Sequence, residues 1–369
     1  MANVKIPFFN YPVLYERHKK DLLPLIDGML SGGRYIMQIE LDSFENDLAN
    51  YLGVKHAIGV ADGTMALILA LMASDIGSGD EVLVPSHTFA ASAAAIAHVG
   101  ATPVLVECDQ FHLMDPVDLE GRITASTKAI MPVQLNGRVA EMDKIVEIAN
   151  RNGLIVIEDA AQALGAKFQG KFAGTFGTAG TFSFYPSKTL GGFGDGGAVV
   201  TNDSRVADSI RILRDHGRHS SGEVLRWGFN SRLDNIQAGI LGYKLKFYDE
   251  EINRRREIAT IYDGYLNVLE SLRLPPPPSN GSHFDIFQNY EIEADSRDEL
   301  RAYLDLRGVK TIIQWGGKVI HQYRALGLNC DLPKTELMSH RFMLLPMNTA
   351  LSNEDVAYIC KQILSFYGK

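Results

Sequence analysis

Short apolar runs alternate with longer amphipathic runs over the first half of the chain. HAIGVA, EVLVP, KAIMPV and LIVIEDA are rich in β-branched and aliphatic residues and are bounded by Gly, Pro or Asp. Between them lie TMALILALMAS, FAASAAAIAHV and EMDKIVEIANRNG, which have the composition and spacing of helices. Apolar runs separated by helical segments predict parallel strands that are buried on both faces. The pattern therefore predicts an α/β architecture.

The second half of the chain changes pattern. TAGTFSFY and GAVVTND follow one another without a clear helix between them, which indicates an antiparallel or loop-joined part of the sheet. Residues 232–272 then have a helical period over an unusual length, which predicts a long connecting helix. LRLPPPPSN cannot continue it, because proline lacks the amide donor and clashes with the preceding turn. Residues 273–281 are thus the expected domain boundary.

Beyond the prolines the chain reads as a strand (DIFQNYEIEA), a helix (SRDELRAYLDLRG), a strand (VKTIIQW) and a closing helix (NEDVAYICKQILSFY). We therefore expect two domains. Residues 1–272 would form a large α/β domain with an N-terminal arm and the connecting helix, and residues 282–369 a small α+β domain.

Composition and charge exclude several classes of protein. The 369 residues are 46% hydrophobic, and 36 basic residues are outnumbered by 44 acidic ones, for a net charge of −8. An acidic balance argues against a broad surface for nucleic acid. The start MANVKIPFFN shows no basic segment followed by an apolar one, so we expect a cytoplasmic protein without a membrane partner. Three widely spaced cysteines predict neither a disulfide framework nor a zinc site.

Ligands of such sheets sit beyond the carboxyl ends of the strands, so the residues after each apolar run are the candidates for ligand contacts. After HAIGVA, Gly63 and Thr64 open a helix whose free amides and positive dipole end could bind a phosphate. An ordinary helix cap is the alternative. After EVLVP, Phe89 could lie flat on a planar cofactor or only fill core space.

Asp159 ends the apolar strand LIVIE. A carboxylate there costs desolvation energy unless it meets a cation, which could be a protonated ring nitrogen, a lysine or a metal. A helix cap is again the alternative. No His or Cys stands at ligand spacing around Glu158 and Asp159, and His216 and His219 form HGRH and not HExxH, so no metal is expected.

Lys188 leaves the strand TAGTFSF and precedes a glycine-rich loop. The glycines follow the lysine, so the run is not a Walker P-loop, and GxGxxG at Gly192 to Gly197 leads into a strand, so it is not a dinucleotide fingerprint. A desolvated lysine amine can attack an aldehyde, whereas a solvated surface lysine is the common alternative. With Asp159, a phosphate-type helix start and Ser183, the set matches what pyridoxal phosphate needs.

Several ordered motifs carry a resemblance to a known family. GTMALILAL, VPSHTFAAS, IEDAAQALGA, SFYPSK, GDGGAVVTND and GFNSRLDNIQAGIL resemble the DegT/DnrJ/EryC1/StrS family of sugar aminotransferases that use pyridoxal 5'-phosphate. The resemblance extends from about Gly32 to the C-terminus. It implies the aspartate-aminotransferase-like fold, type I, with a large mostly parallel sheet domain and a small C-terminal α+β domain.

The resemblance also implies roles for individual residues. Lys188 would form the aldimine with the cofactor, Asp159 would pair with the ring nitrogen, and Gln162 would lie near the phenolic oxygen. Phosphate donors would be Gly63, Thr64 and Ser183, Phe89 would stack on the ring, and Asn230 would reach the cofactor phosphate of a partner subunit. Weaker candidates for the substrate's diphosphate and sugar are Arg34, Tyr35, Arg218 and Lys318.

By the same resemblance, the enzyme would be a homodimer with shared active sites that moves an amino group from L-glutamate to a nucleotide-linked keto sugar by ping-pong transamination. Where relatives carry His-Leu-Tyr-Gly this chain has QLNG at 134–137, and it departs from GRYILGP at 33–39. Both segments lie where the resemblance implies substrate contacts, so the sugar is left open. Dehydration on the same cofactor and a regulatory protein that binds it without turnover are alternatives. The dehydratase branch of the family has histidine in place of the lysine, so the presence of Lys188 excludes that branch.

Overall fold

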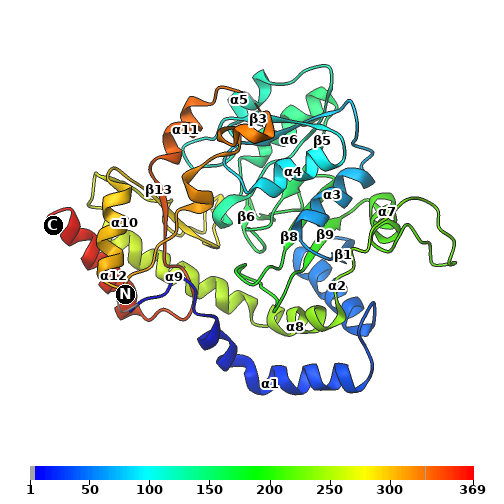
Figure 1. The fold of residues 1–369 in the computed structure, drawn as a ribbon, viewed down its shortest axis with the longest axis horizontal. Helices are drawn as coiled ribbons and strands as arrows, with labels where there is room; N and C mark the ends of the chain where they lie inside the picture. The colour runs from blue at the N-terminus through cyan, green and yellow to red at the C-terminus, as the bar shows by residue number, and fades with distance from the viewer. Residues whose placement is uncertain (1–4, 329) are drawn as a thin grey trace.

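A seven-stranded sheet forms the centre of the protein in a computed structural model that describes residues 5–328 and 330–369 (Figure 1). The strand order is β1-β9-β8-β5-β4-β2-β3, and β9 alone among these strands runs against the others. The predicted α/β architecture, including its antiparallel part, is confirmed. The strands are β1 (His56–Val60), β2 (Glu81–Pro85), β3 (Thr102–Val106), β4 (Thr127–Ile130), β5 (Ile155–Asp159), β8 (Ala179–Ser183) and β9 (Gly197–Thr201).

Helices cover both faces of this sheet (Figure 1). Neighbouring strand residues enter different cores, as Val82 and Leu83 of β2 do, because successive side chains point to opposite faces. One core includes side chains of α2 (Ile39–Leu52), α5 (Pro116–Gly121), α6 (Met142–Asn152) and α8 (Asn235–Leu245). The other includes side chains of α3 (Gly63–Ala73), α4 (Ala90–His98) and α7 (Ser204–Arg214).

A second, three-stranded sheet has the order β10-β12-β13 and is antiparallel. Its core also takes in Ile6 and the end of α9. The domain division at residues 272 and 282 stays a prediction, and the first four residues of the expected N-terminal arm lie outside the described residues. The elements are α9 (Tyr248–Leu266), β10 (Leu272–Arg273), β12 (Tyr290–Ala294), α10 (Arg297–Leu306), α11 (Pro333–Ser339), β13 (Phe342–Leu345) and α12 (Asn353–Phe366).

The remaining elements lie at the edges. α1 (Tyr11–Ser31) packs along α8 at the lower side of Figure 1. A small sheet joins β11 (His283–Phe284), β6 (Lys167–Phe168) and β7 (Lys171–Phe172).

The long helix predicted over residues 232–272 is wrong. The chain forms two helices, α8 and α9, because the amides of Lys246 and Phe247 bond three residues back instead of four and end the first helix. Packing at the start of α9 contributes to the break. Tyr248 is buried and donates a hydrogen bond to the Leu164 carbonyl oxygen at 2.7 Å, which fixes the start of α9.

The strand predicted at VKTIIQW is also wrong. Only Ile312 pairs with a strand, at Leu344, and the chain then turns through a short 3₁₀ segment at Gln314–Gly317. Trp315 and the two glycines after it all have positive φ, which no strand allows. Sequence periodicity alone could not detect this turn, because the preceding residues are β-branched.

Parallel strands bring distant segments of the chain to one edge of the sheet. β1, β2, β5 and β8 run in the same direction, since β1 and β8 are both antiparallel to β9 and the others pair in parallel. The residues that follow these strands therefore lie along the same edge. This edge is where the predicted site residues are found.

We expect Gly264→Ala to raise the free energy of unfolding by about 0.5–1 kcal/mol, because Gly264 is exposed inside α9 and glycine is a poor helix former. A Cβ there would meet no other atom within 4 Å. The measurement is the urea midpoint of the full chain. Gly180→Ala is the contrasting control, since its Cβ would lie 2.0 Å from the Gly174 carbonyl oxygen. A lower midpoint for Gly264→Ala would contradict the packing described.

Candidate active site

Asp159 is buried at the carboxyl end of β5. Its Oδ2 accepts a hydrogen bond from Ser92 Oγ at 2.7 Å, and its Oδ1 accepts one from the Ala161 amide at 3.2 Å. Burial raises the pKa of this carboxyl, while these hydrogen bonds and the charge of Lys188 oppose the rise. The pKa stays raised, so the surroundings do not fully compensate the carboxylate charge. A further cation would be stabilised beside it.

Ser92 is a site residue that the sequence did not identify. It lies on the first turn of α4 and its hydroxyl also contacts Thr88 Oγ1 at 2.7 Å. The only signal was its position three residues after Phe89, which places both on one side of a helix start. Its role is to orient the Asp159 carboxylate.

Lys188 lies in the loop after β8, where its pKa is lowered to about 8. Burial is the main cause, and the attraction of Asp159 opposes it. Within the described part of the chain, no hydrogen bond or ion pair of the Nζ atom is found. An amine with this pKa is uncharged in an appreciable fraction of molecules near neutral pH, so it can attack an electrophilic carbon.

The start of α3 forms a cradle beside Ser183. The Asp62 carboxylate caps the helix by accepting a hydrogen bond from the Met65 amide at 2.8 Å, while the amides of Gly63 and Thr64 donate to no described residue. A Cβ on Gly63 would lie 2.8 Å from the Ser183 Cβ atom, so only glycine leaves this space open. Two free amides at a helix N-terminus, beside a hydroxyl, suit a phosphate group.

Two further predicted cofactor contacts lie at the same sheet edge. Phe89 is 57% exposed at the start of α4, with its ring centroid 6.3 Å from that of Trp315. An exposed ring has a free face for stacking. Gln162 lies three residues after Asp159 and its Oε1 accepts the Asn136 amide at 2.8 Å.

These observations together test whether pyridoxal phosphate fits. The cradle at Gly63 leaves room for a phosphate, the raised pKa of Asp159 leaves a carboxylate ready for a protonated ring nitrogen, and Lys188 is desolvated. The residues present fit the cofactor.

A cavity of 390 Å³ borders Lys188 on another side. It lies between α1 and the start of α9, and its lining includes Lys244, whose pKa burial lowers, but neither Gly63 nor Asp159. We therefore do not place the cofactor in this cavity, although Lys188 contacts it.

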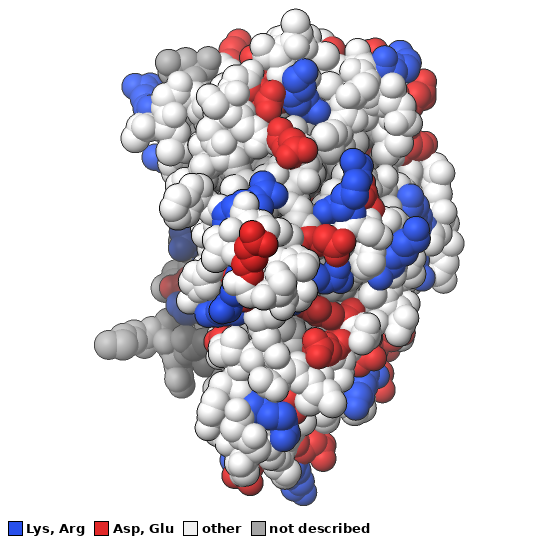
Figure 2. All heavy atoms as spheres, turned by 90° about the vertical axis from the view of Figure 1, so that its right-hand side faces the viewer, with Lys and Arg blue, Asp and Glu red and all other residues white. Residues whose placement is uncertain are grey.

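The candidate substrate cations differ in how strongly they are neutralised. Arg34 pairs with Glu40 at 2.8 Å, and Arg218 pairs with Asp215 at 2.7 Å. Lys318 is exposed and forms no ion pair with a described residue. On the face drawn in Figure 2, basic and acidic side chains are interspersed and neither forms a continuous region.

Two other predicted residues lie on the surface. Tyr35 is 54% exposed, and its carbonyl oxygen accepts the Asn235 amide at 3.0 Å. Asn230 is exposed in the loop after α7 and its backbone pairs with Asp215. Among the described residues, its side chain forms no hydrogen bond with Gly63 or Ser183 of its own chain.

The segment QLNG at 134–137, where substrate contacts were expected, satisfies buried carboxylates instead. Gln134 Nε2 donates to Glu158 at 2.8 Å, and Asn136 Nδ2 donates to Glu291 at 2.7 Å. Glu158 also accepts three backbone amides, which explains how a carboxylate next to Asp159 is tolerated in the core.

In cofactor-free protein we expect acetylation of Lys188 to reach half its limiting rate near pH 8, because burial lowers its pKa to about 8. Peptide mass spectrometry after acetic anhydride labelling measures this midpoint. Asp159→Asn should lower the midpoint further, since the attraction that favours the charged amine is lost. Lys144 is the internal control. It is exposed, and its hydrogen bond to Glu141 raises its pKa above the usual value for lysine. A Lys188 midpoint as high as that of Lys144 would refute the desolvated amine.

Comparisons with known proteins agree with this geometry. The chain is 38% identical to a "pleiotropic regulatory protein" of Geobacillus stearothermophilus, over 99% of each protein. It is 39% identical to the dTDP-3-amino-3,6-dideoxy-alpha-D-galactopyranose transaminase of Aneurinibacillus thermoaerophilus, over 97% of this chain and 98% of that one.

Among solved structures, the crystal structure of DesV from S. venezuelae in complex with a ketimine intermediate superposes with a TM-score of 0.95 at 37% identity, over 100% of both chains. The predicted fold is thereby confirmed. No described helix is both long and apolar enough to cross a membrane. The model of the DegT/DnrJ/EryC1/StrS aminotransferase family matches residues 16–364, and the chain belongs to this family.

Proposed function

We propose that the protein is a pyridoxal-phosphate-dependent aminotransferase that transfers the amino group of L-glutamate to a nucleotide-linked keto sugar. The observation that carries this proposal is the pair formed by desolvated Lys188 and undercompensated Asp159 at one sheet edge. The family and the transaminase relative support the sugar substrate. That relative's name gives a 3-amino sugar, which favours a ketone at C3.

Pyridoxal phosphate, when bound, supplies an aldehyde that condenses with amines and a ring that takes up the electron pair of an adjacent carbanion. Asp159 would hold the proton on the ring nitrogen. Gly63, Thr64 and Ser183 would hold the phosphate, and Phe89 would cover one face of the ring. These contacts would hold the ring in one orientation beside Lys188.

Lys188 would move the proton in both half-reactions. In the first half-reaction its Nζ atom, uncharged in part near pH 7, would take the proton from the α-carbon of glutamate and deliver it to the carbon of the cofactor that carried the aldehyde. In the second, it would take a proton from that cofactor carbon and deliver it to the sugar carbon that becomes the amine-bearing centre of the product. The first half-reaction releases 2-oxoglutarate, and the second aminates the ketone. A base with a pKa near the working pH transfers protons in both directions with little penalty.

The regulatory alternative rests on the names of relatives, such as the "pleiotropic regulatory protein" of Geobacillus stearothermophilus. A protein that only binds the cofactor does not need an amine whose pKa is lowered to about 8 beside a free position. The Lys188 environment therefore favours turnover.

The test is to incubate cofactor-loaded protein with L-glutamate and nucleotide-linked 3-keto and 4-keto sugars, and to measure 2-oxoglutarate and product mass. We expect an aminated 3-keto product, and a rate lower by about 10³-fold or more in Lys188→Ala, because proton transfer is lost. Lys144→Ala, at an exposed lysine, is the matched control and should keep the rate. If 2-oxoglutarate forms but no sugar is aminated, the proposed sugar substrate is wrong. If no 2-oxoglutarate forms either, the protein is not an aminotransferase for glutamate and the regulatory alternative is favoured.

We further propose that the enzyme is a homodimer whose active sites are shared. The loop between α7 and α8 extends from the body of the protein (Figure 1), and Trp227 in it is 94% exposed. Val224, Leu225 and Phe229 are also exposed apolar residues of this loop. Such a patch is costly in water and is typical of an interface. Asn230 at its end would then reach the phosphate in the partner's site.

Mixed dimers test this sharing. Lys188→Ala and Asn230→Asp should each be poorly active alone, the second because a carboxylate repels the phosphate. If Asn230 acts across the interface, one site of each mixed dimer is intact, and random mixing should restore about a quarter of the wild-type rate. No recovery in dissociated and reassociated mixtures would show that Asn230 acts within its own chain.

A further inference from the structure

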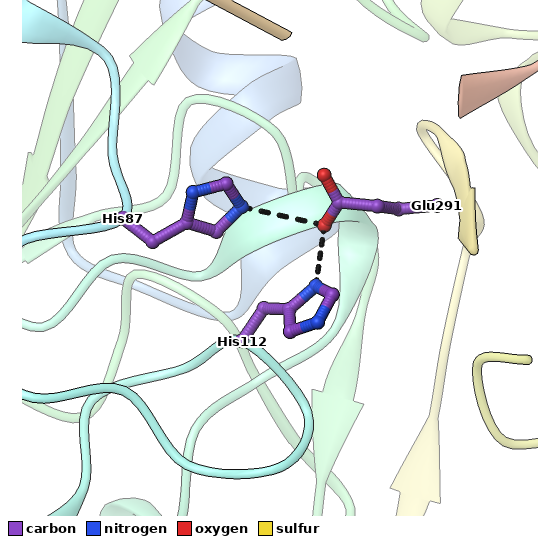
Figure 3. A group of neighbouring side chains, drawn as sticks. All are labelled: His87, His112 and Glu291. Atoms are coloured by element: carbon purple, nitrogen blue, oxygen red, sulfur yellow. Dashed lines mark hydrogen bonds and ion pairs between the residues drawn. The ribbon is translucent and has the colours of Figure 1, made fainter. Parts of the chain in front are cut away.

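Glu291 lies at the centre of a buried polar cluster that connects the seven-stranded sheet to the sheet of β10, β12 and β13. It stands on β12, and its Oε2 accepts hydrogen bonds from His112 Nδ1 at 2.6 Å, from Asn136 Nδ2 at 2.7 Å and from His87 Nε2 at 3.4 Å. Its Oε1 accepts Gln314 Nε2 at 2.9 Å. Figure 3 shows both imidazole rings directed at the same carboxylate oxygen.

The cluster has the residue types of a metal site, since His87, His112 and Glu291 place ligand atoms within 4.8 Å of one another. The hydrogen bonds argue against this interpretation. His112 Nε2 also contacts a carboxylate, Glu293, at 3.2 Å, so both ring nitrogens must carry a proton. A ring protonated on both nitrogens has no lone pair for a metal.

His112 is therefore an imidazolium held between two carboxylates. Burial acts against its charge, but Glu291 and Glu293 raise the pKa of His112 to about 10. His87 is different, because burial lowers its pKa and keeps the ring neutral. The charge of Glu291 is thus balanced inside the protein, and its remaining capacity is used by the amide of Asn136.

Asn136 connects this cluster to the active site. Its side chain is bonded at both ends, since Nδ2 donates to Glu291 and Oδ1 accepts Asn289 Nδ2 at 2.8 Å and Gln314 Nε2 at 3.1 Å. Its backbone is left-handed, with φ of 56°, a conformation that asparagine tolerates better than most residues. In this conformation its amide donates to Gln162 Oε1 at 2.8 Å.

The same contacts fix which way the Gln162 amide faces. Its Oε1 accepts the Asn136 amide and also Asn289 Nδ2 at 3.4 Å, so this end must be the oxygen. Its Nε2 donates no hydrogen bond to a described residue. Gln162 therefore presents a hydrogen-bond donor to any ligand beside Asp159.

We propose that Asn136, held by Glu291, is a positioning residue that orients Gln162 as a donor toward the phenolic oxygen of the cofactor. This inference rests on the proposed function, because it needs the cofactor beside Gln162. A donor withdraws charge from the phenolic oxygen and so weakens the hold of that oxygen on the proton at the neighbouring lysine nitrogen. The cluster around Glu291 thereby tunes the protonation of the cofactor bound to Lys188.

The test is the pH midpoint of the visible absorbance of cofactor-loaded protein, which reports protonation at the lysine nitrogen. We expect Gln162→Ala and Asn136→Gly each to raise the midpoint by about one pH unit, the effect of one lost hydrogen bond to a charged group. Glycine keeps the left-handed backbone available and removes only the side-chain anchor. The double variant should show no further rise, because both changes remove the same contact.

Glu291→Gln is a further test variant. The Glu291 carboxylate accepts hydrogen bonds from several donors, including Asn136, and an amide accepts fewer, so the anchor of Asn136 is weakened. The midpoint should therefore rise, as in Asn136→Gly. Glu107→Gln is the matched control, because Glu107 is also a buried carboxylate. Its side chain accepts hydrogen bonds from Lys334 and Thr335, and from no described residue of the cluster around Glu291. It should leave the midpoint unchanged.

The positioning role would be overturned if the shifts of the two single variants added up in the double variant. It would also be overturned if Asn136→Gly and Glu291→Gln both had the wild-type midpoint. Wild-type protein that shows no visible band with pyridoxal phosphate would instead refute the proposed function. The two failures are thus distinguishable in one series of spectra.

Discussion

The candidate site depends on the cost of holding Asp159 and Lys188 away from water. Each group is destabilised in its charged form by burial, and neither cancels the other completely, as the raised pKa of the acid and the lowered pKa of the amine show. A protein can hold a buried acid and a buried amine at this cost only where surrounding contacts fix the positions of both groups. Here Ser92 and the Ala161 amide fix the carboxylate, and β5 and β8 fix the backbones. The incomplete compensation of both charges is what the proposed function requires of this pair.

The common direction of the strands brings the other residues of the site together. Four strands that run the same way deliver a helix start, an aromatic ring, an acid and an amine to one edge, although these segments are far apart in sequence. Gly63 is required because its neighbour across the edge, Ser183, leaves no room for a Cβ atom. The cradle in which we propose that the phosphate binds thus depends on close packing between α3 and the end of β8.

Sequence alone was sufficient for the features that are local. The strands β1, β2, β4 and β5 are short apolar runs with polar ends. Asp159 ends one such run, and Lys188 lies in the loop that follows β8. The family resemblance then supplied the cofactor, and comparison with relatives confirms the family. Local patterns failed where tertiary packing decides. The helix break at Phe247 and the turn at Trp315 follow from contacts with distant residues that no periodicity encodes.

The polar interior shows the same limit. Gln134 and Asn136 differ from the family pattern and looked like substrate contacts, yet their side chains satisfy Glu158 and Glu291. A buried carboxylate must be satisfied by partners from other parts of the chain, and sequence order does not show which partners these are. Ser92 was missed for this reason, since nothing in FAAS indicates that its hydroxyl faces Asp159.

Borohydride reduction of the cofactor-loaded protein, followed by peptide mapping, tests the central claim most directly, because it fixes the cofactor to whichever lysine carries it. Lys188 has one plausible rival, Lys244, which borders the same cavity and whose pKa is also lowered by burial. The account predicts the reduced label on the peptide that contains Lys188 and on no other. A label on Lys244, or no label on any lysine, would contradict it.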